Sequence, residues 1–308
     1  MTTTQAFDQI GSVTATRIHE WIGELFPRPV LLPDSDRADW EVERSWLVPE
    51  FWSPDSENAW MCAQSFLLRS GGRTILLDTG IGNGKARPGI PPWDDMDNPF
   101  LDTLRAAGVA PAEVDLVINT HLHPDHIGWN TQFIDGAWQP TFPNATYLMP
   151  RVDYEFFAEM GASEVADPFS YGAAFADSIE PIRLNGGNVQ LWEGDEHVID
   201  GALRLMATPG HSPGACVLVV SSDGENAVFA SDTVHHPMQI LDPDQRVLFD
   251  FDDGTAAKMR RKVLSWAAEH RAPVIPYHFP NGRGVRIQDR DGRFQIDSWI
   301  QVPGPAAR

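Results

Sequence analysis

The residue types best suited to chemistry in this sequence are histidine and aspartate, which gather in one short segment. His121, His123, Asp125 and His126 lie within the stretch THLHPDHIG, directly after the apolar run DLVINT. The apolar run predicts a buried strand. The proline after the second histidine turns the chain, so the loop can direct four donor side chains into one region. Imidazole nitrogens and carboxylate oxygens together suit zinc, and also iron or manganese.

Three more candidate ligands follow strand-like runs farther along the chain. His211 lies in TPGHSPG after LRLMA, Asp232 follows AVFAS, and His278 follows VIPY. The alternative interpretation, a histidine-rich surface loop, does not account for ligand types at four separate strand ends. The pattern therefore predicts a metal site where these strand ends meet.

These motifs resemble those of the metallo-β-lactamase superfamily. THLHPDHIG matches its HxHxDH signature, TPGHSPG looks like its third motif, and the later aspartate and histidine fit its fourth and fifth. The similarity extends from about Phe66 to Pro280 and includes LLDTG. The resemblance implies two divalent metal ions per chain, with zinc expected and iron, manganese or cobalt compatible. It assigns one ion to His121, His123 and His211 and the other to Asp125, His126 and His278, with Asp232 and a hydroxide bridging both.

The same resemblance implies a chemistry and a fold. Two cations close together lower the pKa of a shared water molecule and neutralise the oxyanion formed on attack, which places Asp125 in the catalytic centre as well as among the ligands. Asp78, in LLDTG, is expected to orient a histidine ligand rather than to bind metal itself. The implied fold is α/β (α+β), an αββα sandwich of two mixed sheets with helices on the outer faces.

Within the superfamily, the ligand set is similar to that of quorum-quenching lactonases and enzymes like methyl parathion hydrolase. These enzymes carry all seven ligands, so the resemblance implies hydrolysis of a lactone, ester or phosphotriester, with displacement of halide from an activated aromatic as a lesser alternative. The lactonases usually have a tyrosine three residues after the bridging aspartate, whereas this chain has His235. We expect His235 either to donate a hydrogen bond to the oxyanion or leaving group, as a catalytic residue, or to pack beside the site. We expect His236 to be structural.

Two other activities of the same fold remain as alternatives. A persulfide dioxygenase uses a single iron held by two histidines and an aspartate. A thioesterase of the glyoxalase II type would need basic residues for the carboxylates of glutathione. Four arginines near the C-terminus could supply them: Arg283, Arg286, Arg290 and Arg293. A protein that only binds a ligand is a third interpretation, which leaves the open metal positions without purpose.

Aromatic residues near the motifs indicate the kind of substrate. Stacked rings over a pocket favour a neutral, apolar or aromatic small molecule. For each ring taken singly, the alternative is a contact in the core or between subunits. The rings in predicted loops that could overhang the site are Phe51, Trp52, Trp60, Trp93 and Trp129.

Composition narrows the partners and the compartment. The formal net charge of −20 predicts a surface that repels nucleic acid. No apolar run is long enough for a membrane span, and the N-terminal residues lack a secretory pattern. Cys62 and Cys216 lie in apolar, strand-like contexts, which predicts buried free thiols in a reducing compartment. We therefore expect a cytoplasmic enzyme with a small-molecule substrate.

The hydrophobic pattern divides the chain into two parts. Residues 1–60 predict an irregular aromatic arm, packed on the core or on a second subunit in a homodimer, and residues 61–308 predict the catalytic domain. Two adjacent glycines at 71–72 predict a hairpin turn between two apolar strands. Helices are expected over 100–107, 151–160 and 255–270, and further strands over 115–120, 203–207, 215–221, 226–230 and 274–277.

Overall fold

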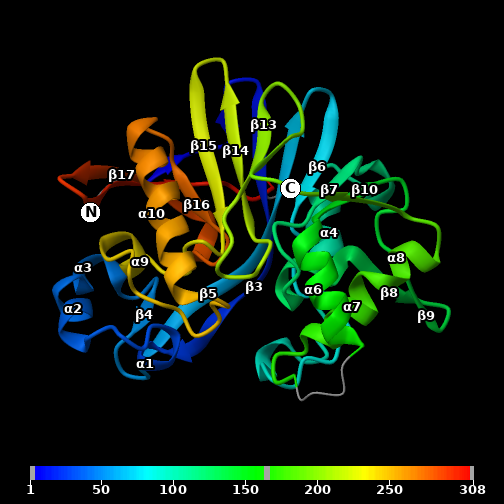
Figure 1. The fold of residues 1–308 in the computed structure, drawn as a ribbon, viewed down its shortest axis with the longest axis horizontal. Coiled ribbons are helices and arrows are strands. Elements are labelled where there is room, and N and C mark those ends of the chain that lie inside the picture. Colours follow the sequence, from blue (N-terminus) through cyan, green and yellow to red (C-terminus); the bar gives the residue numbers. More distant parts are fainter. Residues whose placement is uncertain (1–3, 163–166, 306–308) are drawn as a thin grey trace.

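The computed structural model describes residues 4–162 and 167–305, which form two mixed β-sheets packed face to face (Figure 1). The first sheet has the spatial order β1 (Gln5–Ala6), β18 (Arg293–Gln301), β17 (Arg283–Arg290), β16 (Val274–Pro276), β15 (Glu225–Ser231), β14 (Cys216–Ser222), β13 (Leu203–Ala207) and β12 (Glu196–Val198). The second has the order β11 (Asn188–Trp192), β10 (Thr146–Pro150), β7 (Leu116–Ile118), β6 (Arg73–Leu77), β5 (Asn58–Ser70), β3 (Val13–Pro27) and β2 (Gln9–Ile10), with β4 (Trp52–Ser53) paired to β5.

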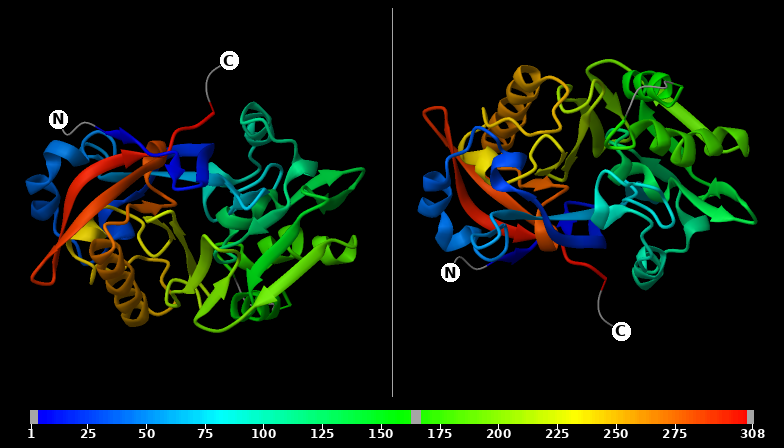
Figure 2. Two further views of the ribbon diagram at one scale, coloured as in Figure 1. Left: turned by 90° about the horizontal axis from the view of Figure 1, so that it is seen from above. Right: turned by 90° about the horizontal axis from the view of Figure 1, so that it is seen from below.

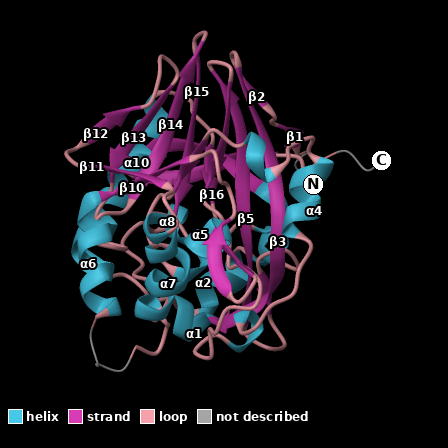
Figure 3. Cartoon of the chain, turned by 90° about the vertical axis from the view of Figure 1, so that its right-hand side faces the viewer, coloured by secondary structure: helices cyan, strands magenta, loops and turns pink. Residues whose placement is uncertain are grey.

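Helices cover the outer face of each sheet, so the predicted αββα sandwich is confirmed (Figures 1 and 3). The first sheet is covered by α9 (Met238–Leu241), α10 (Asp253–Glu269) and the short helices α1 (Arg28–Leu31), α2 (Arg37–Val42) and α3 (Arg44–Leu47). The second is covered by α4 (Phe100–Ala106), α6 (Arg151–Gly161), α7 (Tyr171–Ser178) and α8 (Glu180–Leu184). The hairpin of β8 (Thr131–Ile134) and β9 (Ala137–Pro140) projects at the far side from the β17–β18 hairpin (Figure 2). The remaining short helices are α5 (Pro124–Ile127), η1 (Pro91–Trp93), η2 (Pro111–Glu113), η3 (Gly128–Asn130) and η4 (Pro280–Gly282).

The central strands are rich in apolar residues because both of their faces are buried. Along β14, Leu218 packs between the sheets in one cluster with Phe66 and Phe229, while Val217 and Val219 face the helices that cover the first sheet. Burying both faces removes more apolar surface from water than a half-exposed sheet would, at roughly 25 cal/mol for each Å². The sandwich therefore gives the strand ends a rigid base.

Most predicted elements of the catalytic part are present. Gly71 and Gly72 have φ of 56° and 79°, and Ser70 pairs with Arg73 across them, which is the two-residue hairpin that paired glycines favour. The predicted helices correspond to α4, α6 and α10, and the predicted strands to β7, β13, β14, β15 and β16.

The expectation of an irregular arm is wrong for residues 13–27. They form β3, which pairs with β5 from Thr14 opposite Arg69 to Pro27 opposite Asn58. Polar and apolar residues alternate only in its first half, and the strand is set by its long neighbour β5 rather than by its own pattern. Trp40 and Trp52, from the same region, are buried in the core. The division at residue 60 and a role for these residues in a dimer remain predictions.

Two smaller expectations concern the thiols and the membrane. Cys62 and Cys216 are buried free thiols, as predicted. Their Sγ atoms lie 3.1 Å from the carbonyl oxygen of Phe279 and 3.2 Å from that of Thr120, respectively. Over the ranges that the structure describes, no helix combines the length and the apolar character needed to cross a membrane.

Candidate metal centre

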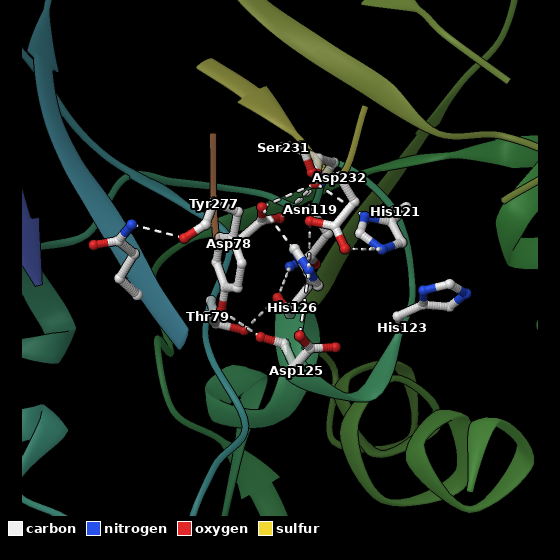
Figure 4. Close-up of polar contacts among 12 residues, drawn as sticks. Asp78, Thr79, Asn119, His121, His123, Asp125, His126, Ser231, Asp232 and Tyr277 are labelled. Atoms are coloured by element: carbon white, nitrogen blue, oxygen red, sulfur yellow. Dashed lines mark hydrogen bonds and ion pairs between the residues drawn. The ribbon is translucent and has the colours of Figure 1, made fainter. Parts of the chain in front are cut away.

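The seven predicted ligands meet at one end of the sandwich, where strands of both sheets terminate. Figure 4 shows five of them: His121, His123, Asp125, His126 and Asp232. Four of the seven follow β7 of the second sheet: His121 and His123 lie in the loop after it, and Asp125 and His126 lie in α5. The other three follow β13, β15 and β16 of the first sheet. All seven are buried, with exposed fractions of 7% or less: His121, His123, Asp125, His126, His211, Asp232 and His278.

The ligand atoms separate into groups whose members lie within 4.8 Å of one another. Two of the four groups match the sets predicted from the sequence, and the other two contain Asp232. The matching groups are His121 with His123 and His211, and Asp125 with His126 and His278. The groups with Asp232 are His121 with His126 and Asp232, and His211 with Asp232 and His235.

Asp232 lies in the centre of these groups. Its Oδ1 is 3.3 Å from His126 Nε2, and its Oδ2 is 3.3 Å from His211 Nε2 and 3.1 Å from His278 Nε2. Burial alone would raise the pKa of Asp232, but His278 and His126 hold it well below its usual range. The carboxylate is therefore ionised and touches both ligand sets.

The donor atoms in this centre lack partners that a metal ion would supply. Among the described residues, His121 Nε2, His126 Nε2 and Asp232 Oδ1 are buried without a hydrogen bond. His211 Nε2 and His123 Nδ1 lie only 2.9 Å apart. Buried polar atoms without partners cost free energy, and cations coordinated by them would remove that cost. The nitrogen and oxygen donors thus fit divalent ions such as zinc, iron or manganese.

Hydrogen bonds behind the rings orient three of the histidines. His126 Nδ1 donates to Asp78 Oδ2 at 3.0 Å, and His278 Nδ1 donates to the carbonyl oxygen of Cys62 at 2.9 Å. His211 Nδ1 lies 3.1 Å from Asp250 Oδ1. A proton held on Nδ1 leaves the lone pair of Nε2 free to face the centre. Asp78 thus contacts His126 in the way the sequence led us to expect.

Sequence reasoning missed two buried carboxylates that support the ligands. Asp250, which contacts His211, is held by Arg260 Nη2 at 3.3 Å. Asp153 accepts hydrogen bonds from Leu122 N at 3.2 Å, from Ser212 Oγ at 2.7 Å and from Gly214 N. Asp250 lies in a loop without a motif. Asp153 resembles any acidic residue in the first turn of a helix, so no sequence feature marked either.

His235 and His236 lie in different surroundings. His235 lines the pocket with its Nε2 3.2 Å from Asp232 Oδ2, and neither ring nitrogen has a hydrogen-bond partner among the described residues. Burial lowers the pKa of His235 to about 4, so the ring is neutral. His236 instead stacks on Trp40 at 4.3 Å, and its Nε2 lies 3.2 Å from the carbonyl oxygen of Phe51. His236 is part of the core, as expected.

The pocket above the centre has a polar floor and apolar walls. Candidate ligands and His235 form the floor. The walls suit an apolar molecule. The walls consist of Leu25, Phe26, Met61, Ile90, Trp93, Pro124, Phe169, Tyr171 and Phe249.

The aromatic residues in these walls differ from most of those predicted. Of the five rings that the sequence placed near the pocket mouth, Trp93 is the one that lines the pocket. Phe51 and Trp52 are buried in the core, because the segment that carries them packs under the first sheet. Trp129 stacks on Phe100 at 5.3 Å, and Trp60 donates its Nε1–H to a serine hydroxyl. Their proximity to the motifs in the sequence does not place them at the mouth.

A sequence profile described as the Metallo-beta-lactamase superfamily matches residues 63–278. Since this is more than half of the chain, the protein belongs to that superfamily.

Relatives and solved structures show what the chain is similar to. The N-acyl homoserine lactonase AttM of Rhizobium radiobacter is 27% identical over 191 residues, which are 61% of this chain and 66% of the lactonase. Ribonuclease TTHA0252 of Thermus thermophilus is 30% identical over 190 residues, which are 60% of this chain and 38% of the ribonuclease. The matches thus span less than two thirds of each relative. The structure of AidC, a dizinc quorum-quenching lactonase in complex with a product, superimposes with a TM-score of 0.70 at 19% identity and covers 97% of both chains. At that identity the likeness shows the fold alone.

Proposed function

We propose that this protein is a dinuclear metal-dependent hydrolase of neutral, apolar or aromatic lactones, esters or phosphotriesters, with zinc as the expected metal. His121, His123 and His211 would hold one ion, and Asp125, His126 and His278 the other, with Asp232 between them. Bound there, the two ions would supply an activated water nucleophile and neutralise the negative charge that develops on attack.

The observation that carries this proposal is the arrangement of unpaired, buried donor atoms in two groups around one ionised carboxylate. A site for a single ion would need only one of the groups. The residues of the chain perform the remaining work. Asp78 and Asp250 hold histidine rings in the tautomer that frees Nε2, and the apolar walls exclude water from the reacting bond.

The substrate class follows from the pocket and from the relatives. Apolar walls above a floor of candidate metal ligands favour a carbonyl or phosphoryl compound with an apolar group. The lactonase relative acts on acyl homoserine lactones, as its name states. The ribonuclease relative acts on RNA, but a net charge of −20 makes a polyanionic substrate unfavourable here.

The test combines metal analysis with a substrate panel. We expect elemental analysis to find close to two metal ions per chain, and we expect turnover of lactones, aryl esters or phosphotriesters. Asp232→Ala should weaken the binding of both ions. Asp232→Asn should retain some metal but lose more activity than the roughly 10–100-fold that removal of an outer partner of a ligand costs. A fully loaded preparation with one ion, or wild-type turnover in Asp232→Asn, would contradict the assignment.

The same measurements separate the alternatives. One iron ion per chain with oxygen consumption would indicate a persulfide dioxygenase, and cleavage of glutathione thioesters would indicate a thioesterase. The second alternative loses support from its arginines. Arg283 binds Glu50 at 2.8 Å, and the described residues that line the pocket include none of Arg283, Arg286, Arg290 and Arg293.

A further inference from the structure

A buried ion cluster lies outside the metal centre. Lys85 and Arg87 belong to the loop of residues 78–99, and Asp177 belongs to α7. Lys85 Nζ is 3.2 Å from Asp177 Oδ1. Arg87 makes two parallel bonds to the same carboxylate, at 2.8 and 2.9 Å. The three side chains are 0%, 2% and 15% exposed, respectively, so this is not a surface ion pair of the kind that contributes little.

The cluster contains one more positive than negative charge. Lys85 Nζ also lies 2.9 Å from Thr131 Oγ1 and 3.7 Å from the centre of the Trp138 ring. These contacts offset part of the cost of burying a cation. Burial still lowers the pKa of Lys85 to about 8, although Asp177 opposes this shift. Apolar side chains would fill the same space at less cost, so stability alone explains the cluster poorly.

The cluster joins the two segments that form one side of the substrate pocket. The loop carries Ile90 and Trp93, and the other segment carries Phe169 and Tyr171. The segments also meet directly at Gly89, where a Cβ atom would lie 1.6 Å from the carbonyl oxygen of Pro168. Any change in the distance between the segments therefore changes the shape of the pocket.

We propose that Lys85, Arg87 and Asp177 form a positioning cluster that sets the spacing of this pocket wall and thereby selects the apolar group of the substrate. The paired bonds between Arg87 and Asp177 have a fixed geometry, which packed apolar side chains do not impose. None of the three residues lines the pocket. They act through the four side chains on the joined segments that do line it, which are Ile90, Trp93, Phe169 and Tyr171. The inference rests on the proposed hydrolase function.

Two variants disturb this spacing by independent routes. Lys85→Met removes one cation and leaves the neutral Arg87–Asp177 pair, so it avoids stranding a buried charge. Gly89→Ala changes no charge but forces the loop away from Pro168. The matched control is Asp200→Asn, which breaks the 2.8 Å pair between Arg73 and Asp200. Arg73 begins β6 and Asp200 lies in the turn before β13, so the pair is at the opposite ends of these strands from the ligands.

The probes are p-nitrophenyl esters and N-acyl homoserine lactones with acyl chains from acetyl to decanoyl. We expect both variants to raise KM for the decanoyl compounds at least about tenfold, which is what one displaced methylene contact is worth. The acetyl compounds should keep their KM, and kcat and metal content should stay within about twofold, since only uniform binding is lost. Asp200→Asn should leave the chain-length dependence unchanged.

Two outcomes would contradict the positioning cluster, and a third would contradict the proposed hydrolase function. An unchanged KM for decanoyl compounds in both variants would overturn the positioning cluster. A parallel fall of kcat and metal content for every chain length would also overturn it, because the cluster would then support the fold or the metals. A wild type that cleaves no member of either series, and no phosphotriester of the substrate panel, would overturn the proposed function instead.

Discussion

His235 occupies the side of the centre formed by Asp232, His211 and His278, and it is the residue at which the chain departs from the lactonase pattern. Its ring stacks against that of His278 with 5.4 Å between the ring centres. Its nitrogens have no hydrogen-bond partner among the described residues, and the Nε2 atom of the neutral ring lies 3.2 Å from Asp232 Oδ2. The position therefore suits a donor that meets the substrate.

We predict that His235→Ala lowers kcat about 10²–10³-fold, the usual loss when one donor to an oxyanion is removed, while metal content stays unchanged. His235→Tyr should raise lactone turnover relative to ester turnover. The measurements are metal content, melting temperature and kcat for one lactone and one aryl ester.

The adjacent histidine provides the control for this prediction. His236→Ala removes a ring that stacks on Trp40 in the core, so it should lower the melting temperature with little effect on kcat. If kcat of His235→Ala stays within about threefold of wild type for both substrates, the residue only packs beside the site.

At the level of elements, α6 connects two ligand-bearing loops that are far apart in the sequence. Asp153, in its first turn, accepts from Leu122 N, between His121 and His123, and from Ser212 Oγ, next to His211. Three of the proposed ligands thus depend on one carboxylate for their relative placement. In the other set, His126 contacts Asp78, which also accepts a hydrogen bond from Thr120 N beside His121.

We predict that Asp153→Asn weakens metal binding at the His121, His123 and His211 set by about 10–100-fold, the cost typical of a lost outer partner. The asparagine amide has the size of the carboxylate, but its NH₂ group is a donor. It would face the donors that now bind Asp153, which include Leu122 N and Ser212 Oγ. Binding at the second set should change much less. Titration of the metal-free protein with cobalt, followed by absorption, would resolve the two affinities.

An exposed aspartate serves as the control for Asp153. Asp102 is 79% exposed, and among the described residues its ion pair is with Arg105 three residues away, so Asp102→Asn should leave both affinities unchanged. Equal weakening of the two sets in Asp153→Asn would show that the carboxylate stabilises the fold in general rather than one metal site.

At the level of the whole molecule, the N-terminal residues complete the second sheet. Glu20, in β3, accepts hydrogen bonds from Ile81 N at 2.6 Å, from Gly82 N at 2.9 Å and from Trp129 Nε1 at 2.7 Å. The end of β3 also contributes Leu25 and Phe26 to the pocket. These residues therefore support both the fold and the substrate site.

We predict that a chain lacking residues 1–27 loses cooperative folding, because β5 becomes an unpaired apolar edge and the donors to Glu20 lose their acceptor. Removing only residues 1–8 deletes the two-residue strand β1 and should lower the melting temperature by a few °C, as expected for about 1–2 kcal/mol. Thermal melts and size-exclusion chromatography distinguish the two. A folded, monomeric chain without residues 1–27 would restore the interpretation of a separable arm.

The sequence by itself determined the superfamily, the layered fold and the cluster of candidate ligands. Ligand side chains follow strand ends in short motifs, and the strands reveal themselves by continuous apolar runs, so both features are local in the chain. The Gly71–Gly72 turn and the helix α10 were predictable for the same reason. The ligands come together because the sandwich aligns the ends of β7, β13, β15 and β16.

Only the tertiary structure decided which other residues surround that centre. Asp153 and Asp250 act on loops distant in sequence, and a single carboxylate carries no mark of its eventual partners. Trp93 lines the pocket whereas Trp129 does not, since the side of the chain on which a ring is buried depends on contacts with separate segments. The strand β3 likewise owes its conformation to pairing with β5, because cross-strand contacts override weak local preference.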